Sequence, residues 1–443
     1  MANERTNTTN YTHPQETNLL NVHKAMEYNS LGQPVIRTTG SGGQYSTSGN
    51  TNTGIDAFGR QRVSEPFTIF DNSFRYGDDT RNWSIATAGS GTSTPLENES
   101  SIQMSVSNAS GDSVYRETKR VFQYQPGKSL LILNTFVMST PKANLRQRVG
   151  YFGNENGIFV EQDGLTLNIV KRDYLTSAPT DTQIAQTSWN VDPLNGTGPS
   201  GITLDMSKAQ IFWIDMEWLG VGSVRTGFVI NGQFVIAHIF HHANIISSVY
   251  MTTATLPIRY EIENTAGTSG NSTMKQICST VMSEGGFTPR TESRAASTAL
   301  AGLALSNSVV KPLVSIRLKA DRQDAVAVPT YIDMYGIQNA PFRWAIYQNT
   351  TISDGTWTST GPESNVEYNV TATTTISGAR KILEGTIIGA AKGGANTIFL
   401  DNLNHSLQLK RNINGTPEIF TLAMTATTPS DAALGTIAWQ EMN

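Results

Sequence analysis

The stretch that decides the fold reads GFVINGQFVI and runs over Gly227–Ile236. Two runs of aromatic and β-branched residues flank Asn231-Gly232, a dipeptide that readily adopts the positive φ angles of a type I′ turn. Strand-like runs on both sides of such a dipeptide predict an antiparallel hairpin. A second hairpin is predicted around Asp163-Gly164, which also separates two apolar runs.

The segment IFWIDMEW, Ile211–Trp218, lies upstream of this hairpin and alternates with a period of two. In an extended strand, Phe212 and Met216 point to one face, whereas Asp215 and Glu217 point to the other. The pattern predicts a strand that presents one apolar face to a core and one polar face to solvent.

Further strand-like runs are spread over the chain, and hardly any segment has a helical period. They are Leu130–Val137, Val249–Ile258, Val309–Leu318, Ala325–Tyr335, Phe342–Tyr347, Val366–Thr374, Lys381–Ile388, Thr397–Leu400 and Ile419–Met424. The Ala/Leu segment Ala295–Leu305 fits either a short helix or a packed strand. Regular strands with turn signals between them predict a mainly β protein built as antiparallel sandwiches or jelly rolls.

Composition divides the chain into three parts. Residues 1–56 are rich in Thr, Asn, Ser and Gly and cannot form a core of their own, so they are predicted to be an extended polar N-terminal arm. Within it, Val35 and Ile36 are candidate anchor points. Residues 57–290 are predicted to form a jelly-roll β-sandwich domain and residues 291–443 a C-terminal β-sandwich. The arm is either a flexible tail or a segment that orders on a neighbouring subunit.

The overall composition excludes several classes of function. Charged residues make up 15% of the 443 residues, and the formal net charge is -4, so no basic field for a nucleic-acid backbone is expected. The single cysteine, Cys278, excludes an intrachain disulfide framework and a cysteine-based zinc cluster. No secretory signal is expected at the N-terminus, and no apolar run approaches the roughly 20 residues of a membrane span.

Three stretches of the sequence resemble a known family. The block AFGRQRVSEPFTIFD, Ala57–Asp71, is similar to a block in virion structural proteins of tailed bacteriophages, as are Arg148–Phe152 and Gly198–Gly222. The resemblance covers roughly residues 30 to 443. It implies a role in assembly, with no chemistry, and leaves open a position on the capsid, at the neck or in the tail.

Phe58, Arg60 and Arg62 in this block are candidate assembly residues, together with Val35 and Ile36 of the arm. On an extended segment the two arginines face the same way and could bind carboxylates of a neighbouring chain. The alternative is that they pair with acidic residues of their own domain.

Trp213, Asp215 and Glu217 carry the strongest hint of other chemistry. The segment around them resembles the active-site strand of concanavalin-like endo-glucanases, whose pattern is Glu-aliphatic-Asp-x-Glu. Here Trp213 stands where the nucleophilic Glu is required, so no catalytic residues are predicted. An exposed tryptophan beside carboxylates could still bind a sugar without cleaving it, which makes these three residues a candidate glycan site.

Three histidines, His238, His241 and His242, follow one another closely after the predicted hairpin. Histidine is the commonest metal ligand, but no carboxylate lies within this segment to complete a set. Loop or interface histidines are the favoured interpretation, and no metal or other cofactor is predicted.

Taken with the resemblance, these features predict a non-enzymatic structural component of a tailed-phage virion, assembled in the host cytoplasm. The favoured position is the capsid exterior, as a decoration or head-fibre protein. Its expected partners are other virion proteins and further copies of itself, with a trimer as the candidate for a projecting fibre. The alternative is a tail or neck component or a receptor-binding fibre that binds host surface glycans. Neither nucleic acid nor a membrane is an expected partner.

Overall fold

The computed structural model describes residues 26–28, 34–36, 56–57, 65–286, 291–389, 396–400, 407–427 and 431–442. These residues form antiparallel β-sheets and two short 3₁₀ turns, η1 (Glu97–Glu99) and η2 (Gln186–Ser188). The expectation of a mainly β protein with two sandwiches is therefore confirmed. No helix in these ranges is long and apolar enough to span a membrane.

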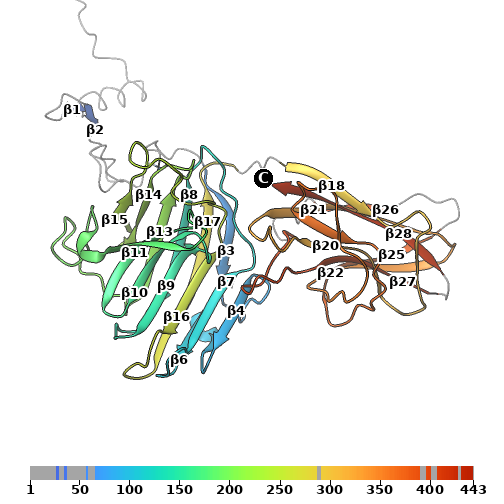
Figure 1. Ribbon diagram of the computed structural model, residues 1–443, viewed down its shortest axis with the longest axis horizontal. Helices are drawn as coiled ribbons and strands as arrows, with labels where there is room; N and C mark the ends of the chain where they lie inside the picture. The colour runs from blue at the N-terminus through green and yellow to red at the C-terminus, as the bar shows by residue number, and fades with distance from the viewer. Residues whose placement is uncertain are drawn as a thin grey trace, which may run out of the picture.

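The first sandwich packs two sheets face to face (Figure 1). Sheet I has seven strands in the order β12 (Thr180–Ala185), β11 (Thr166–Asp173), β10 (Gly157–Asp163), β9 (Leu145–Phe152), β16 (Ile258–Asn264), β7 (Ser113–Thr118) and β4 (Trp83–Ala88). Sheet II has eight, namely β15 (Gln233–Phe240), β14 (Val224–Ile230), β13 (Gln210–Met216), β8 (Leu130–Val137), β17 (Ser272–Ser283), β6 (Ser101–Val106) and β5 (Thr92–Leu96), with β3 (Phe67–Ser73) also paired to β17.

The second sandwich lies beside the first and is smaller (Figure 1). Sheet III contains β18 (Thr291–Ser297), β28 (Ala432–Met442), β21 (Val326–Gly336) and β26 (Asn396–Phe399), with β19 (Leu303–Ala304) paired to β28. Sheet IV runs in the order β23 (Thr358–Ser359), β24 (Val366–Asn369), β20 (Lys311–Leu318), β27 (Phe420–Ala426), β22 (Pro341–Gln348) and β25 (Arg380–Ile388). A separate pair, β1 (Met26–Tyr28) and β2 (Pro34–Ile36), belongs to neither sandwich.

Period-two alternation places the two cores. Phe212, Ile214 and Met216 of β13 are fully buried and pack between sheets I and II, as their spacing predicts. In the second sandwich, Phe342 and Ile346 of β22 take the same role between sheets III and IV. These two strands thus each contribute every second side chain to the core between their sheets.

Both predicted hairpins are confirmed. Strands β14 and β15 pair up to Ile230 opposite Gln233, and both Asn231 and Gly232 have positive φ angles, 52° and 75°. Strands β10 and β11 pair up to Asp163 opposite Thr166. The ambiguous segment around residues 295–305 is extended, because β18 and β19 both pair with β28.

The prediction of a strand over Val249–Ile258 is wrong, because regular pairing begins only at Ile258 in β16. Most apolar residues of this segment are buried at the end of the first core, and the pairing within it before Ile258 is a single antiparallel bridge between Leu256 and Phe122. Side chains satisfy the backbone donors here: Asn156 accepts from the Thr252 N–H, and the Tyr151 hydroxyl accepts from the Leu256 N–H. A run of buried apolar residues therefore did not require a strand.

A polar seam joins the two sandwiches. The Lys119 ammonium lies 2.6 Å from the Glu418 carboxylate, and the Arg411 guanidinium lies 2.6 Å from the Glu117 carboxylate. The segment around Arg411 also runs along residues 119–121, with its N–H donating to the Lys119 carbonyl. These groups are mostly shielded from solvent, so the seam fixes the second sandwich against sheet I.

We expect Glu418→Gln to lower the free energy of unfolding by about 2 kcal/mol, because it leaves the shielded Lys119 ammonium without its carboxylate. The measurement is equilibrium denaturation in urea. A matched control is Glu99→Gln, which breaks the more exposed pair with Lys275 and is expected to cost less than about 1 kcal/mol. Equal losses in the two variants would contradict a structural role for the seam.

Candidate functional site

The predicted sugar-binding face on β13 is not exposed. Trp213 is only 1% exposed and packs against Phe234, with ring centroids 5.6 Å apart. The expectation of an exposed stacking platform at Trp213 is wrong, because the outer face of sheet II carries its own apolar cluster, which includes Leu131 and Ile236. Alternation identified the two faces of β13, but it could not show that both are buried.

The structure also separates the two carboxylates. Asp215 lies within β13 and is 1% exposed, whereas Glu217 lies beyond the end of the strand in the turn that leads to β14. There, the Glu217 carboxylate accepts from the Ser223 N–H. Asp215 and Glu217 therefore do not share an open polar face.

Asp215 instead belongs to a buried polar cluster at the root of the N-terminal arm. It lies opposite Arg225 in the register of β13 and β14, and the two side chains form an ion pair. The Ser129 hydroxyl donates to the same carboxylate and accepts from the Ala57 N–H. Asp56, directly before Ala57, is 4% exposed. The point at which the arm joins the first sandwich is thus fixed by a charged pair inside that sandwich.

Of the five candidate assembly residues, Phe58, Arg60 and Arg62 lie outside the described residues. Val35 and Ile36 lie in β2, where Val35 is opposite Glu27 and Ile36 is opposite Met26 of β1. Their role as anchor points stays a prediction.

A ladder of arginines and carboxylates crosses the outer face of sheet I. Arg148 of β9 lies between Glu161 of β10 and Glu261 of β16, at 4.0 and 2.6 Å. Arg259 contacts Glu261 at 2.5 Å and Glu117 at 3.0 Å. Because Glu117 also pairs with Arg411, the ladder continues into the seam between the sandwiches.

The environment shifts the pKa values of the two central carboxylates of the ladder, Glu161 and Glu261, in opposite directions. Burial raises the pKa of Glu161 above its ordinary value. Burial acts on Glu261 in the same sense, but the charges of Arg148 and Arg259 outweigh it and hold its pKa below its ordinary value. A pair of this kind can divide acid and base roles in an enzyme. Here the two residues are 1% and 2% exposed, so a substrate cannot reach them, and their role is to pair with arginines of the sheet.

Sequence reasoning missed this ladder, although a signal was present. Residues 145–149 read LRQRV and residues 259–263 read RYEIE, so arginines stand at alternate positions of the first segment and glutamates at alternate positions of the second. Opposite charges at alternate positions of two strands that pair side by side predict cross-strand ion pairs. The pairing itself, between segments over a hundred residues apart, is visible only in the fold.

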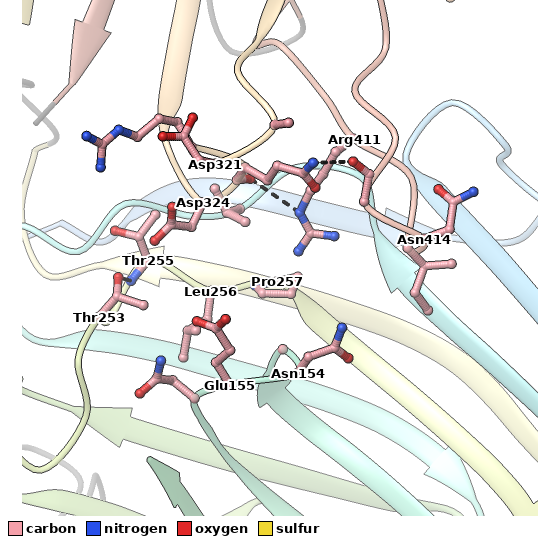
Figure 2. A pocket seen from close by; sticks show the side chains of 18 residues that line it. Asn154, Glu155, Thr253, Thr255, Leu256, Pro257, Asp321, Asp324, Arg411 and Asn414 are labelled. Atoms are coloured by element: carbon pink, nitrogen blue, oxygen red, sulfur yellow. Dashed lines mark hydrogen bonds between the residues drawn. The ribbon is translucent and has the colours of Figure 1, made fainter. Parts of the chain in front are cut away.

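A cleft of about 660 Å³ lies between the sandwiches beside the seam. Figure 2 shows Asp321 and Asp324 of the second sandwich facing Glu155 of the first, with Thr253 and Thr255 between them. The Arg411 side chain donates to the Gln323 backbone carbonyl at the back of the cleft. The lining offers hydroxyl, amide and carboxylate groups to solvent. No group of three His, Cys, Asp or Glu within the described ranges is arranged to hold a metal ion.

The histidines lie around the end of β15. His238 accepts from the Asn190 N–H through Nδ1, and the His242 ring stacks on Tyr250 at 4.0 Å with Nδ1 2.6 Å from the Gly222 carbonyl. Burial lowers the pKa of both residues to about 4. Both rings are therefore neutral and structural at pH 7.

Comparisons with known proteins give likenesses of fold alone. No family model matches the sequence, and no curated protein matches it. Solved structures that match include a legume lectin-like domain from Entamoeba histolytica, with 12% identity, 49% of this chain and 98% of that chain covered, and a TM-score of 0.30. The GH16 protein of the Bacteroides ovatus mixed linkage glucan PUL matches with 10% identity, 48% and 99% coverage, and a TM-score of 0.33.

A third match is the CBM2 module of the evolved Dit of Lactobacillus casei BL23 phage J-1. Its identity is 7%, with 51% of this chain and 100% of that chain covered and a TM-score of 0.33. Each match spans about half of this chain, and none assigns it a function.

We expect Asp215→Asn to lower the free energy of unfolding by about 3 kcal/mol, because it removes the carboxylate charge that lies against the buried Arg225 guanidinium. Urea denaturation measures this loss. The control is Asp181→Asn, which removes the more exposed partner of Arg172 and should cost less than about 1 kcal/mol. Asp215→Asn should also speed protease cleavage near Ala57. An unchanged cleavage rate would contradict a role of Asp215 in holding the arm root.

The two buried histidines predict a loss of stability in acid. Their folded-state pKa of about 4 lies below the ordinary value near 6.5, so the unfolded chain binds protons first as the pH falls. Stability is full above about pH 6.5 and declines towards pH 4, by up to about 3 kcal/mol for each histidine. His242→Phe keeps the stack on Tyr250 and should flatten this decline in urea unfolding measured from pH 8 to 4.5. An unchanged slope would contradict the assignment, and the exposed His241→Gln serves as the control.

Proposed function

We propose that this protein is a non-enzymatic structural component of a tailed-phage virion that assembles through its N-terminal arm. The observation that carries the proposal is the arm root. The Ala57 N–H donates to Ser129, whose hydroxyl donates to the carboxylate of the buried Asp215–Arg225 pair, and the neighbouring Asp56 is buried, whereas β1 and β2 upstream pair only with each other among the described strands. A segment attached to the sandwich at this point can bind a second chain while the sandwich stays folded.

The polar composition of the arm supports the same function. Backbone hydrogen bonds and a few apolar side chains along such a segment can supply a large shared interface with another chain. The partners we propose are other virion proteins and further copies of this chain.

The two joined sandwiches suit a projecting position. The seam of shielded ion pairs holds the second sandwich against the first, so a contact made by one domain constrains the other. Few charges and many hydroxyl and amide groups give a surface of low net field. Together with the resemblance of residues 57–71 to tailed-phage virion proteins, this supports a place on the capsid exterior, as a decoration or head-fibre protein.

The alternative is a tail or neck component, or a receptor-binding fibre that binds host surface glycans. Trp213 gives this alternative no support, since its ring is buried. A groove on the outer face of sheet IV in the second sandwich, lined by Arg343 and Tyr347, is the observation that favours a glycan-binding role.

Light scattering on the full-length protein and on a variant lacking residues 1–55 tests the assembly role. We expect an oligomer that becomes a monomer on truncation, because the truncation removes the proposed interface. The remaining chain should stay folded, because it keeps Asp56, Ala57 and both sandwiches. Circular dichroism of the truncated variant controls for folding. An oligomer that survives truncation would place the interface in the sandwiches, and a monomer in both cases would contradict self-association through the arm.

A further inference from the structure

The second sandwich carries a groove of about 510 Å³ on the outer face of sheet IV. Its lining comes from three adjacent strands, β25, β22 and β27, and from the segment that precedes β20. Phe342 and Ile346 of β22 point into the core, so Arg343, Ala345 and Tyr347 lie on the opposite, outer face. The volume lies within the range of ordinary small-ligand sites.

Two small residues make the floor of the groove. Ala345 of β22 lies directly opposite Ala423 of β27 and, on its other side, Glu384 of β25. In the neighbouring row, Arg343 lies between Thr386 and Thr425. Alanine pairs flanked by larger side chains leave a hollow along the sheet.

The walls of the groove are fixed by hydrogen bonds. At one end, Tyr347 of β22 lies opposite Thr421 of β27. Thr421 is buried and hydrogen-bonded to the hydroxyls of Ser315 and Thr350. Along one side, Asn307 forms a bridge with Ala426, and the Ser308 N–H donates to the Ala426 carbonyl. The hollow is therefore preformed.

The side chains around the floor combine an aromatic ring with charged groups. Lys381 and Glu384 form an exposed ion pair at 2.6 Å. Arg343 is exposed and makes no ion pair within the described part of the chain. Two cations against one carboxylate leave a net charge of about +1 at the groove. Tyr347 is half-buried and adds an aromatic surface beside them.

We propose that this groove binds a sugar that carries a carboxylate, as part of an acidic glycan. Tyr347 supplies the surface on which a sugar ring stacks, and Arg343 supplies a fork that can bind the carboxylate in two places. Lys381 and Glu384 donate to and accept from ring hydroxyls, as does Asn307 at the opposite wall. The inference does not depend on assembly through the arm, which involves the other sandwich.

Isothermal titration of the full-length protein tests the proposal, with a hexamer of guluronate as the acidic probe and laminarihexaose as the neutral one. We expect the hexauronate to bind at least 10-fold more tightly than the neutral hexamer. Arg343→Ala and Tyr347→Ala should each weaken hexauronate binding by 10-fold or more, and Ala345→Leu should abolish it by filling the floor.

The matched control is Arg322→Ala, which removes an exposed arginine of the same charge at the interdomain cleft and should leave binding unchanged. Thermal unfolding confirms that each variant is folded. No binding of the hexauronate at millimolar concentration would overturn the proposal, as would equal losses in Arg343→Ala and Arg322→Ala, which indicate unspecific charge attraction. Tight binding of the neutral probe would overturn the choice of an acidic glycan.

Discussion

The first sandwich depends on one constraint: its central strands are buried on both faces, so charges on the outer face must be paired. Transfer of an unpaired charge out of water costs several kcal/mol, and a partner directly opposite in the register offsets that cost. Arg148 between Glu161 and Glu261, and Asp215 opposite Arg225, both meet this requirement across neighbouring strands. The register of the sheets is thereby specified by charge as well as by the apolar core.

The same pairing extends beyond the first sandwich. Glu117 of sheet I accepts from Arg259 within the sheet and from Arg411 of the other domain. One carboxylate thus belongs both to the ladder and to the seam, and the relative position of the two sandwiches depends on the register of sheet I. A displacement of β7, which carries Glu117, would disturb both contacts together.

Local signals in the sequence predicted most strands and both hairpins, because turn residues such as Asn231-Gly232 act over a few positions. They failed where the decisive neighbour is distant. The burial of Trp213 depends on an apolar cluster on the outer face of sheet II, and the segment Val249–Ile258 is held by side chains of Tyr151 and Asn156. Strand β28 (Ala432–Met442) was not predicted, since its many small residues give a weak pattern, yet it pairs with β18, β19 and β21.

The separation of the arm root from the groove has a mechanical consequence. The arm joins the first sandwich at Ser129 and Asp215, whereas the groove around Arg343 and Tyr347 lies on the second. A protein that is attached through one domain and binds a ligand with the other must keep the two domains in a fixed orientation. Free rotation at the junction would otherwise uncouple the ligand site from the attachment point. Shielded ion pairs such as Lys119–Glu418 meet this need better than a flexible linker, because each charged group has one partner at a defined position, which fixes the orientation of the two sandwiches. Under the proposed functions, the polar seam is the feature that allows attachment through the arm and recognition at the groove to reside in different domains.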